Sequence, residues 1–245
     1  MTKIIPLEQG NRFQMGGGDS RHLVSPEIGA QGITMNYSIF QPGHEFPQHF
    51  HDVSADIFIV LEGGVSVRQG DEYTPIHQGD FAYIPPGEVH GTVNTTHAQA
   101  ILISFQAPPD QSLYSGDRDP ANTGVTPRPP EGHVTTVQIR QLTEEQPTNL
   151  AGIKSWHAAS PETGTKEMHL NYYELEPNGE ISRSATEGES IWFAWQGTAT
   201  IASAGESWSI PNRGVAFVPP GEAVIVQNLG TETAQLIRCQ AIVLP

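Results

Sequence analysis

An internal repeat constrains this chain more than any other feature of its 245 residues. Segment 56–63 (DIFIVLEG) aligns with segment 190–197 (SIWFAWQG) at an offset of 134 residues, 190 minus 56. At the same offset, segment 81–88 (FAYIPPGE) aligns with segment 215–222 (VAFVPPGE). Because one offset relates two separate motifs, the sequence predicts two copies of one domain.

Both copies have the pattern of β-structure. Short runs of β-branched and aromatic residues recur between Gly, Pro and Asn, and helical periodicity is scarce. The 25 Gly and 20 Pro residues also fit short strands joined by many turns. We therefore expect an all-β chain of two tandem barrels, residues 1–106 and 134–245. The Pro- and Gly-rich segment 107–133 is predicted to be a linker between them.

Charge and cysteine content exclude several classes of function. With 12 basic and 27 acidic residues, the formal net charge is −15, which disfavours nucleic-acid and anionic membrane partners. The single cysteine, Cys239, cannot form an intrachain disulfide or a cysteine-based zinc site, and this fits a reducing compartment. No apolar run has the length of a signal peptide core or a membrane span, so we expect a cytoplasmic protein.

The first repeat carries a histidine motif. Gly43 is followed by five residues and then by His49-Phe-His51; Asp56 comes after four more residues, and Gly63 after another six. On a strand, His49 and His51 would project from the same face because they are two residues apart.

A second motif follows in the same repeat. Gly79 is followed by five residues and the turn 85–87 (PPG); His90 comes after two more residues, and Asn94 after another three. Together the two motifs resemble the signature of the cupin superfamily, with Asp56 where glutamate is usual. The resemblance implies two double-stranded β-helix (jelly-roll) barrels.

Three imidazoles and a carboxylate that converge inside a barrel suit one divalent transition metal: Fe, Mn, Ni, Co, Cu or Zn. We expect His49, His51, Asp56 and His90 to be its ligands. Aspartate is one methylene shorter than glutamate, so two other roles stay open for Asp56. It could contact a metal-ligating side chain without binding the metal itself, or it could act as a general base. At the offset of 134, His90 becomes Val224 and Asp56 becomes Ser190, and the histidine pair becomes Arg183 and Ala185, or Ala185 and Glu187 if two residues are gapped. The second repeat is therefore predicted to bind no metal in this way.

Within the cupins, the motif spacing is similar to that of flavonol (quercetin) 2,3-dioxygenases, which often have two barrels. That resemblance implies metal ligation by the four residues named above, with Asp56 also acting as the catalytic base toward the substrate hydroxyl. Alternation along the strand puts Phe58 on the same face as Asp56. Three further residues are predicted to line the pocket: Tyr37, Tyr83 and Ile103.

We therefore predict a metal-dependent dioxygenase that takes O2 and a small enolic or phenolic substrate. A redox-neutral cupin isomerase, cyclase or lyase needs the same ligands and is the first alternative. A non-catalytic protein that binds a small ligand is the second. A homodimer would cover exposed edge strands.

Overall fold

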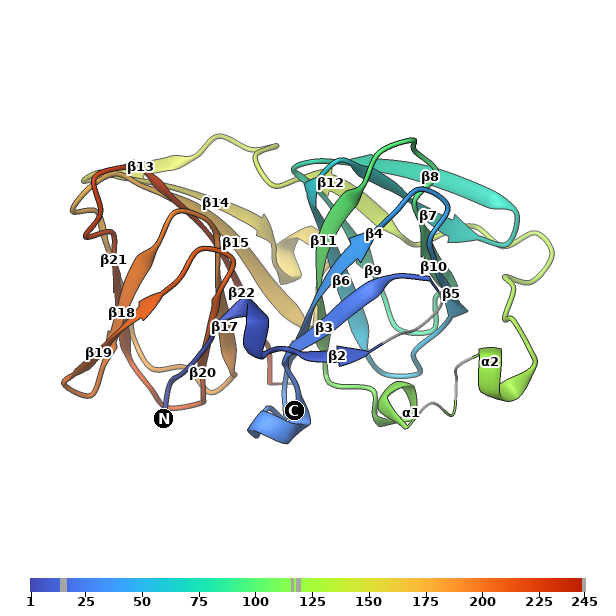
Figure 1. Ribbon diagram of the computed structural model, residues 1–245, viewed down its shortest axis with the longest axis horizontal. Coiled ribbons are helices and arrows are strands. Elements are labelled where there is room, and N and C mark those ends of the chain that lie inside the picture. Colours follow the sequence, from blue (N-terminus) through green and yellow to red (C-terminus); the bar gives the residue numbers. More distant parts are fainter. Residues whose placement is uncertain (14–16, 116, 118–119, 244–245) are drawn as a thin grey trace. The chain divides into compact units, whose positions relative to one another are not determined.

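The computed structural model of the protein describes residues 1–13, 17–115, 117 and 120–243. The described chain is almost entirely β-structure and forms two compact units, each built from two antiparallel sheets (Figure 1). The predicted all-β fold of two barrels is confirmed. None of the described helices has the length and apolar character that a bilayer crossing requires.

The first barrel encloses a core of apolar side chains between its two sheets. Phe40, Phe58 and Leu102 from the larger sheet pack with Val65 and Val67 from the smaller one. The larger sheet has the order β12 (Gln138–Gln141), β9 (Asp80–Ile84), β6 (Ala55–Glu62), β11 (Ala100–Ala107), β4 (Thr34–Phe40), β3 (Asp19–Val24), β2 (Asn11–Phe13). The smaller sheet has the order β5 (Glu45–His49), β10 (His90–Val93), β7 (Gly64–Gln69), β8 (Glu72–His77).

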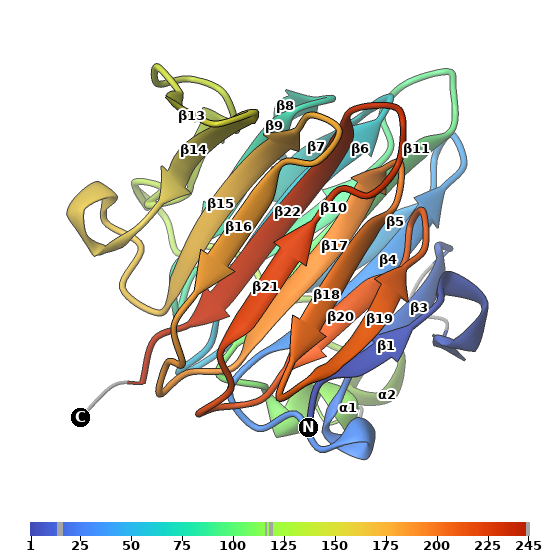
Figure 2. The same ribbon diagram turned by 90° about the vertical axis from the view of Figure 1, so that its left-hand side faces the viewer.

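The second barrel repeats this plan (Figure 2). Its larger sheet has the order β1 (Lys3–Ile5), β20 (Val215–Val218), β17 (Ser190–Gln196), β22 (Ala234–Ala241), β15 (Met168–Leu175), β14 (Ile153–Ala159), β13 (Thr148–Leu150). Its smaller sheet has the order β16 (Glu180–Arg183), β21 (Val224–Gln227), β18 (Ala199–Ser203), β19 (Glu206–Ile210). The described residues also form short helical turns: η1 (Leu7–Gln9), η2 (Pro26–Ile28), α1 (Gln111–Tyr114), α2 (Pro120–Thr123) and η3 (Pro161–Thr163).

The compact units do not follow the predicted boundaries at 106 and 134. One unit contains residues 11–22 and 34–141, and the other contains residues 1–10, 23–33 and 142–245. The reason is strand pairing, because β1 pairs with β20 and β12 pairs with β9. Each barrel therefore takes an edge strand from the other half of the chain, and hydrophobic periodicity cannot reveal which sheet an edge strand joins. The predicted linker 107–133 belongs to the first unit.

The repeated asparagines make equivalent hydrogen bonds in the two barrels. Asn94 Nδ2 donates to the carbonyl oxygens of Phe40 and Ala98, at 2.9 and 2.8 Å. Asn228 Nδ2 donates to the carbonyl oxygens of Leu175 and Glu232, at 2.9 and 2.7 Å. These side chains satisfy backbone acceptors where strands end, so the sequence repeat extends to individual hydrogen bonds.

Candidate metal centre

Strand pairing brings the two histidine motifs of the first barrel together. His49 ends β5 and is the direct cross-strand partner of His90, which begins β10. The Gly87 N–H donates to the carbonyl oxygen of His51 at 2.7 Å and so ties the turn 85–87 to the segment after β5. Asp56 comes from β6 in the larger sheet, and all four side chains are buried. The fold therefore assembles the predicted group from separate parts of the sequence.

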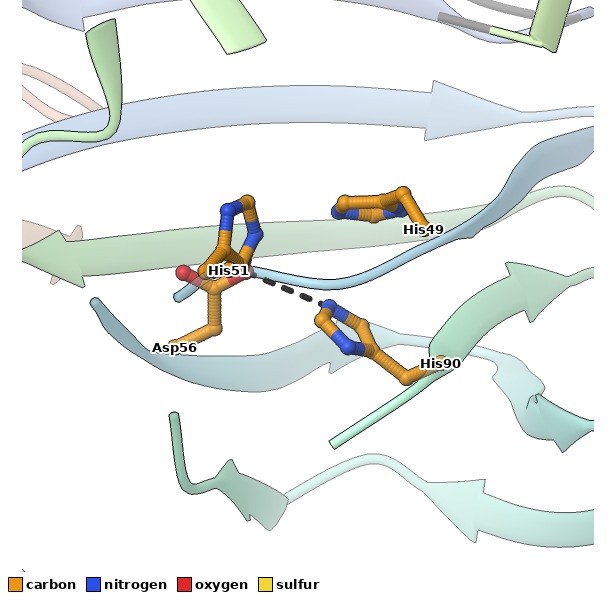
Figure 3. Close-up of side chains that lie close together, drawn as sticks. All are labelled: His49, His51, Asp56 and His90. Carbon is orange, nitrogen blue, oxygen red and sulfur yellow. Dashed lines mark ion pairs between the residues drawn. The ribbon is translucent and has the colours of Figure 1, made fainter. Parts of the chain in front are cut away.

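The four side chains turn their polar atoms toward one another (Figure 3). One ligand atom from each lies within 4.8 Å of the other three. The Oδ2 atom of Asp56 is 3.2 Å from His51 Nε2 and 3.4 Å from His90 Nε2. A single ion at the centre of this group would be within reach of every side chain.

Hydrogen bonds on the far side of each ring fix which nitrogen faces the centre. The Nδ1 atoms of His49 and His90 lie 2.8 and 2.9 Å from the carbonyl oxygens of Pro47 and Glu88. A carbonyl can only accept, so each Nδ1 carries a proton, and Nε2 is the nitrogen that faces the centre. The buried Nε2 of His90 has no hydrogen-bond partner among the described residues. An unsatisfied nitrogen beside a carboxylate fits a cation, and this donor set suits a divalent transition metal.

His51 is hydrogen-bonded by a residue that no sequence motif identifies. Its Nδ1 lies 2.7 Å from Asp110 Oδ2, and this carboxylate also accepts hydrogen bonds from Ser112. Asp110 lies in the predicted linker. A carboxylate behind a ligating histidine orients the ring and increases its basicity toward a metal. No spacing rule links residues 51 and 110, so only the structure identifies this contact.

Gln106 is the second residue that the sequence analysis missed. Its Nε2 lies 3.1 Å from Asp56 Oδ1 and 3.3 Å from His51 Nε2, and its Oε1 accepts from the Asp110 N–H at 2.7 Å. Gln106 pairs directly with Asp56 across β11 and β6. A useful signal was present in the sequence, because Gln240 stands at the matching position of the second repeat, 134 residues later.

The charges in the cluster depend strongly on one another. Burial and the neighbouring charges of His90 and His51 lower the pKa of His49 well below its usual value. Burial acts the same way on His51, but the charges and hydrogen bonds of Asp56 and Asp110 outweigh it and raise the pKa to about 9. Burial opposes ionisation of Asp56, yet His51 and His90 hold the pKa of that carboxyl far below its usual range. Without a metal, the centre is therefore an ion pair between His51 and Asp56.

A cavity adjoins the cluster inside the barrel, and it corrects part of the predicted pocket. Phe58 lines it together with His49 and Asp56. Tyr37, Tyr83 and Ile103 are buried but lie on the opposite face of the same sheet. The prediction was wrong for these three because strand side chains alternate, and their positions have the opposite parity to the inward residues. The other described lining residues are Phe13, Asn36, Ser38, Phe40, Phe46, Thr92, Leu102, Ser104 and Gln106.

Known proteins resemble this chain in fold and, more weakly, in sequence. Residues 36–105 match the family described as Cupin_2, a cupin domain. Polyketide synthase CurC of Streptomyces cyaneus is 26% identical over 166 residues, which cover 67% of this chain and 92% of the relative. Tetracenomycin polyketide synthase protein TcmJ of Streptomyces glaucescens is 26% identical over 124 residues, 50% of this chain and 72% of the relative.

Solved structures extend the likeness to both barrels. Oxalate decarboxylase of Bacillus subtilis, in a structure described in connection with its Mn(II) centres, matches with a TM-score of 0.77. The two proteins are 17% identical, and the match covers 96% of this chain and 76% of that chain. A further structure of that enzyme, at pH 4.6, gives a TM-score of 0.76 at 17% identity, over 96% of this chain and 75% of that chain. The resemblance predicted from motif spacing is confirmed at the level of the superfamily.

Proposed function

We propose that this cupin protein is a metal-dependent enzyme that dioxygenates a small enolic or phenolic substrate in its first barrel. One observation carries the proposal. Three imidazoles and a carboxylate, all buried, meet beside a cavity whose described lining contains neither lysine nor arginine.

The cavity wall favours a particular class of substrate. Aromatic and aliphatic side chains make up part of the wall, and serine, threonine and amide groups supply neutral hydrogen-bonding partners. A dianion such as oxalate would meet no cationic side chain in this lining. An enol or phenol brings only one negative charge after it loses its proton, and the metal can balance that charge. The one arginine near the motifs, Arg68, is engaged by Glu45 at 2.6 Å and does not line the cavity.

The curated relatives support the same class of substrate. Both are named as polyketide synthase proteins. Polyketide chains carry alternating carbonyl groups, and their enol and phenol forms are the compounds that a cavity without lysine or arginine in its described lining would accept. These names also favour the second candidate, a redox-neutral cyclisation or isomerisation at the same metal.

Each residue of the centre has a distinct role in the proposed reaction. A bound transition metal supplies Lewis acidity and, when it is redox-active, the capacity to exchange electrons with the substrate and O2. His49, His51 and His90 would hold the metal through Nε2. Asp56 is ionised, and it would be the base toward the substrate hydroxyl once His51 has lost the proton that holds the pKa of this carboxyl down. Gln106 donates to Asp56 Oδ1 and fixes the plane of the carboxylate.

Entry to the cavity involves Phe13. The cavity volume is about 30 Å3, which accommodates only water-sized ligands. Phe13 also lines an outer pocket of about 520 Å3, together with Arg12 and His44. We expect the Phe13 ring to move when an aromatic substrate enters, because it is shared by the two spaces.

Oxygen uptake distinguishes the candidate reactions. Wild-type protein and His49→Ala, each with its metal content measured, are assayed against a flavonol, a 1,3-diketone and a polyphenol, with and without O2. Dioxygenation predicts substrate-dependent O2 uptake by the wild type and none by the variant. Equal turnover without O2 would favour the redox-neutral reaction instead. Full metal occupancy with no turnover of any substrate would contradict both and favour a binding protein.

A further inference from the structure

The second barrel carries a charged group where the first barrel carries its metal cluster. Arg183 ends β16 and pairs directly with Val224, just as His49 ends β5 and pairs with His90. Arg183 therefore occupies the position of a proposed metal ligand.

A second arginine reaches the same interior. Arg238 on β22 pairs with Trp192 on β17, as Ser104 on β11 pairs with Phe58 on β6. Ser104 and Phe58 both line the cavity beside the metal cluster, so Arg238 stands at a position that faces the barrel interior. Figure 2 shows the strands that contribute to this group, β15, β16, β17 and β22.

Each arginine lies against one of two stacked aromatic rings. The rings of Tyr173 and Trp192 are stacked with their centroids 5.6 Å apart. The Cζ atom of Arg183 lies 5.8 Å from the Tyr173 centroid, and that of Arg238 lies 5.5 Å from the Trp192 centroid. Arg183 also donates to the Tyr173 hydroxyl at 2.7 Å, and Arg238 donates to Gln240 Oε1.

Among the described residues, these two cations have no counter-charge. Neither guanidinium forms an ion pair with a carboxylate in the described part of the chain, although Arg238 is only 6% exposed. The Nε atoms of both arginines and Nε1 of Trp192 are buried and have no hydrogen-bond partner among the described residues. Burial and the charge of Arg183 together lower the pKa of Arg238. All the unsatisfied atoms are donors, so what this interior lacks is an acceptor that carries negative charge.

We propose that the second barrel binds a small oxyanion, a carboxylate or a phosphate, between Arg183 and Arg238. Burying an unpaired charge is costly, and an anion that receives hydrogen bonds from both guanidinium groups would remove that cost. Arginine suits the task because its planar donors match the two oxygens of a carboxylate or phosphate. The flanking rings would contact the apolar part of an organic carboxylate.

Thermal unfolding of the metal-loaded protein tests the proposal. Sodium acetate, benzoate and phosphate are titrated against sodium chloride at equal ionic strength, with tryptophan fluorescence as a second readout because Trp192 lies at the site. We expect one of the oxyanions to raise the unfolding temperature by about 5 °C at 100 times its Kd. The acetate and benzoate arms identify a carboxylate site, and the phosphate arm identifies a phosphate site. Identical curves for all four salts would overturn the proposal.

Variants locate the effect. Arg238→Met should abolish the oxyanion-dependent shift and leave the unliganded protein at least as stable, because it removes an unpaired buried charge. Arg183→Met is the independent second variant. Arg128→Met is the matched control, since Arg128 is exposed and pairs with Asp71 on the surface. A shift that survives in both site variants would overturn the proposal.

A metal-free arm excludes binding at the first barrel. An anion could coordinate the proposed metal directly, so the titration is repeated on His49→Ala and on protein stripped with a chelator. We expect the oxyanion shift to persist in both, because it depends on Arg183 and Arg238 only. Loss of the shift with the metal would assign the anion to the metal centre and contradict the proposal.

Discussion

The two barrels share one scaffold and differ in the kind of ion that their interiors suit. In the first barrel, His49 faces His90 across a strand pair, and Asp56 completes a group suited to a cation. In the second barrel, the equivalent pair is Arg183 and Val224, and the interior collects positive charge with no carboxylate partner among the described residues. Their backbone registers and terminal asparagine contacts correspond closely. A few inward positions therefore decide which kind of ligand each barrel can hold.

The two barrels also share a supporting glutamine, although their charged groups differ. Gln106 and Gln240 occupy equivalent positions, and each contacts the charged group of its own barrel. In the first barrel the amide donates to a carboxylate, and in the second its oxygen accepts from a guanidinium. An amide carries both a donor and an acceptor, so the same residue can serve sites of opposite charge.

The largest difference between the barrels should follow removal of one imidazole. We expect His90→Ala to reduce metal content to background, because the cluster loses a nitrogen donor that has no substitute nearby. The equivalent change in the second barrel, Val224→Ala, is the matched control and should leave metal content unchanged. Elemental analysis of both variants after identical purification measures the effect. Full metal occupancy in His90→Ala would show that the cluster is not the metal centre.

Asp110 should matter less than a ligand but more than a surface carboxylate. We expect Asp110→Asn to weaken metal binding by about 10–100-fold, because the amide removes the charge behind His51. Asp71→Asn, at an exposed aspartate, is the control and should bind metal normally. A competition titration against a chelator measures both affinities. Equal affinities in the two variants would contradict a positioning role for Asp110.

Metal binding in the first barrel and anion binding in the second should depend differently on pH. The raised pKa of His51, about 9, means that metal binding at neutral pH must displace a proton from it. Metal affinity should therefore rise by roughly tenfold per pH unit up to about pH 9. In the metal-free protein, folding stability should fall as pH rises, whereas metal affinity increases. The His51–Asp56 pair stabilises the fold fully below about pH 6.5, and this contribution is lost as pH rises through about 9.

The second barrel provides the control for that experiment. Binding of acetate or benzoate by guanidinium groups should change little between about pH 6 and 8, because the carboxylate and the arginines stay charged throughout that range. Calorimetry in buffers of different ionisation enthalpy measures proton release on metal binding. Proton-neutral metal binding at pH 7 would contradict the predicted charge on His51.

The smallest expected effect is on stability, at the asparagine that both barrels have at the same position. We expect Asn94→Ala and Asn228→Ala to lower the free energy of unfolding by similar amounts, about 1–3 kcal/mol each, because each leaves backbone carbonyls unsatisfied. Chemical denaturation of the two variants measures the difference. A cost in only one barrel would show that the repeat is not equivalent at this position.

Much of the site could be predicted from the sequence because its residues are close together in motifs. His49 and His51 share one motif, and His90 follows a turn whose Pro-Pro-Gly sequence is itself a signal. The pocket wall was only partly predicted. Phe58 lies on the expected face, but Tyr37 lies on the opposite one, because nothing local fixed the parity of its strand relative to Asp56.

The amino-acid sequence by itself determined the repeat, the β-structure and the four clustered side chains, since all of these depend on local pattern and spacing. Only the tertiary structure decided that β1 and β12 exchange barrels, that Asp110 supports His51, and that Arg183 and Arg238 share one interior. The physical reason is that these contacts join residues far apart in the chain. Their energies depend on hydrogen-bond geometry and burial, which exist only after the strands have paired.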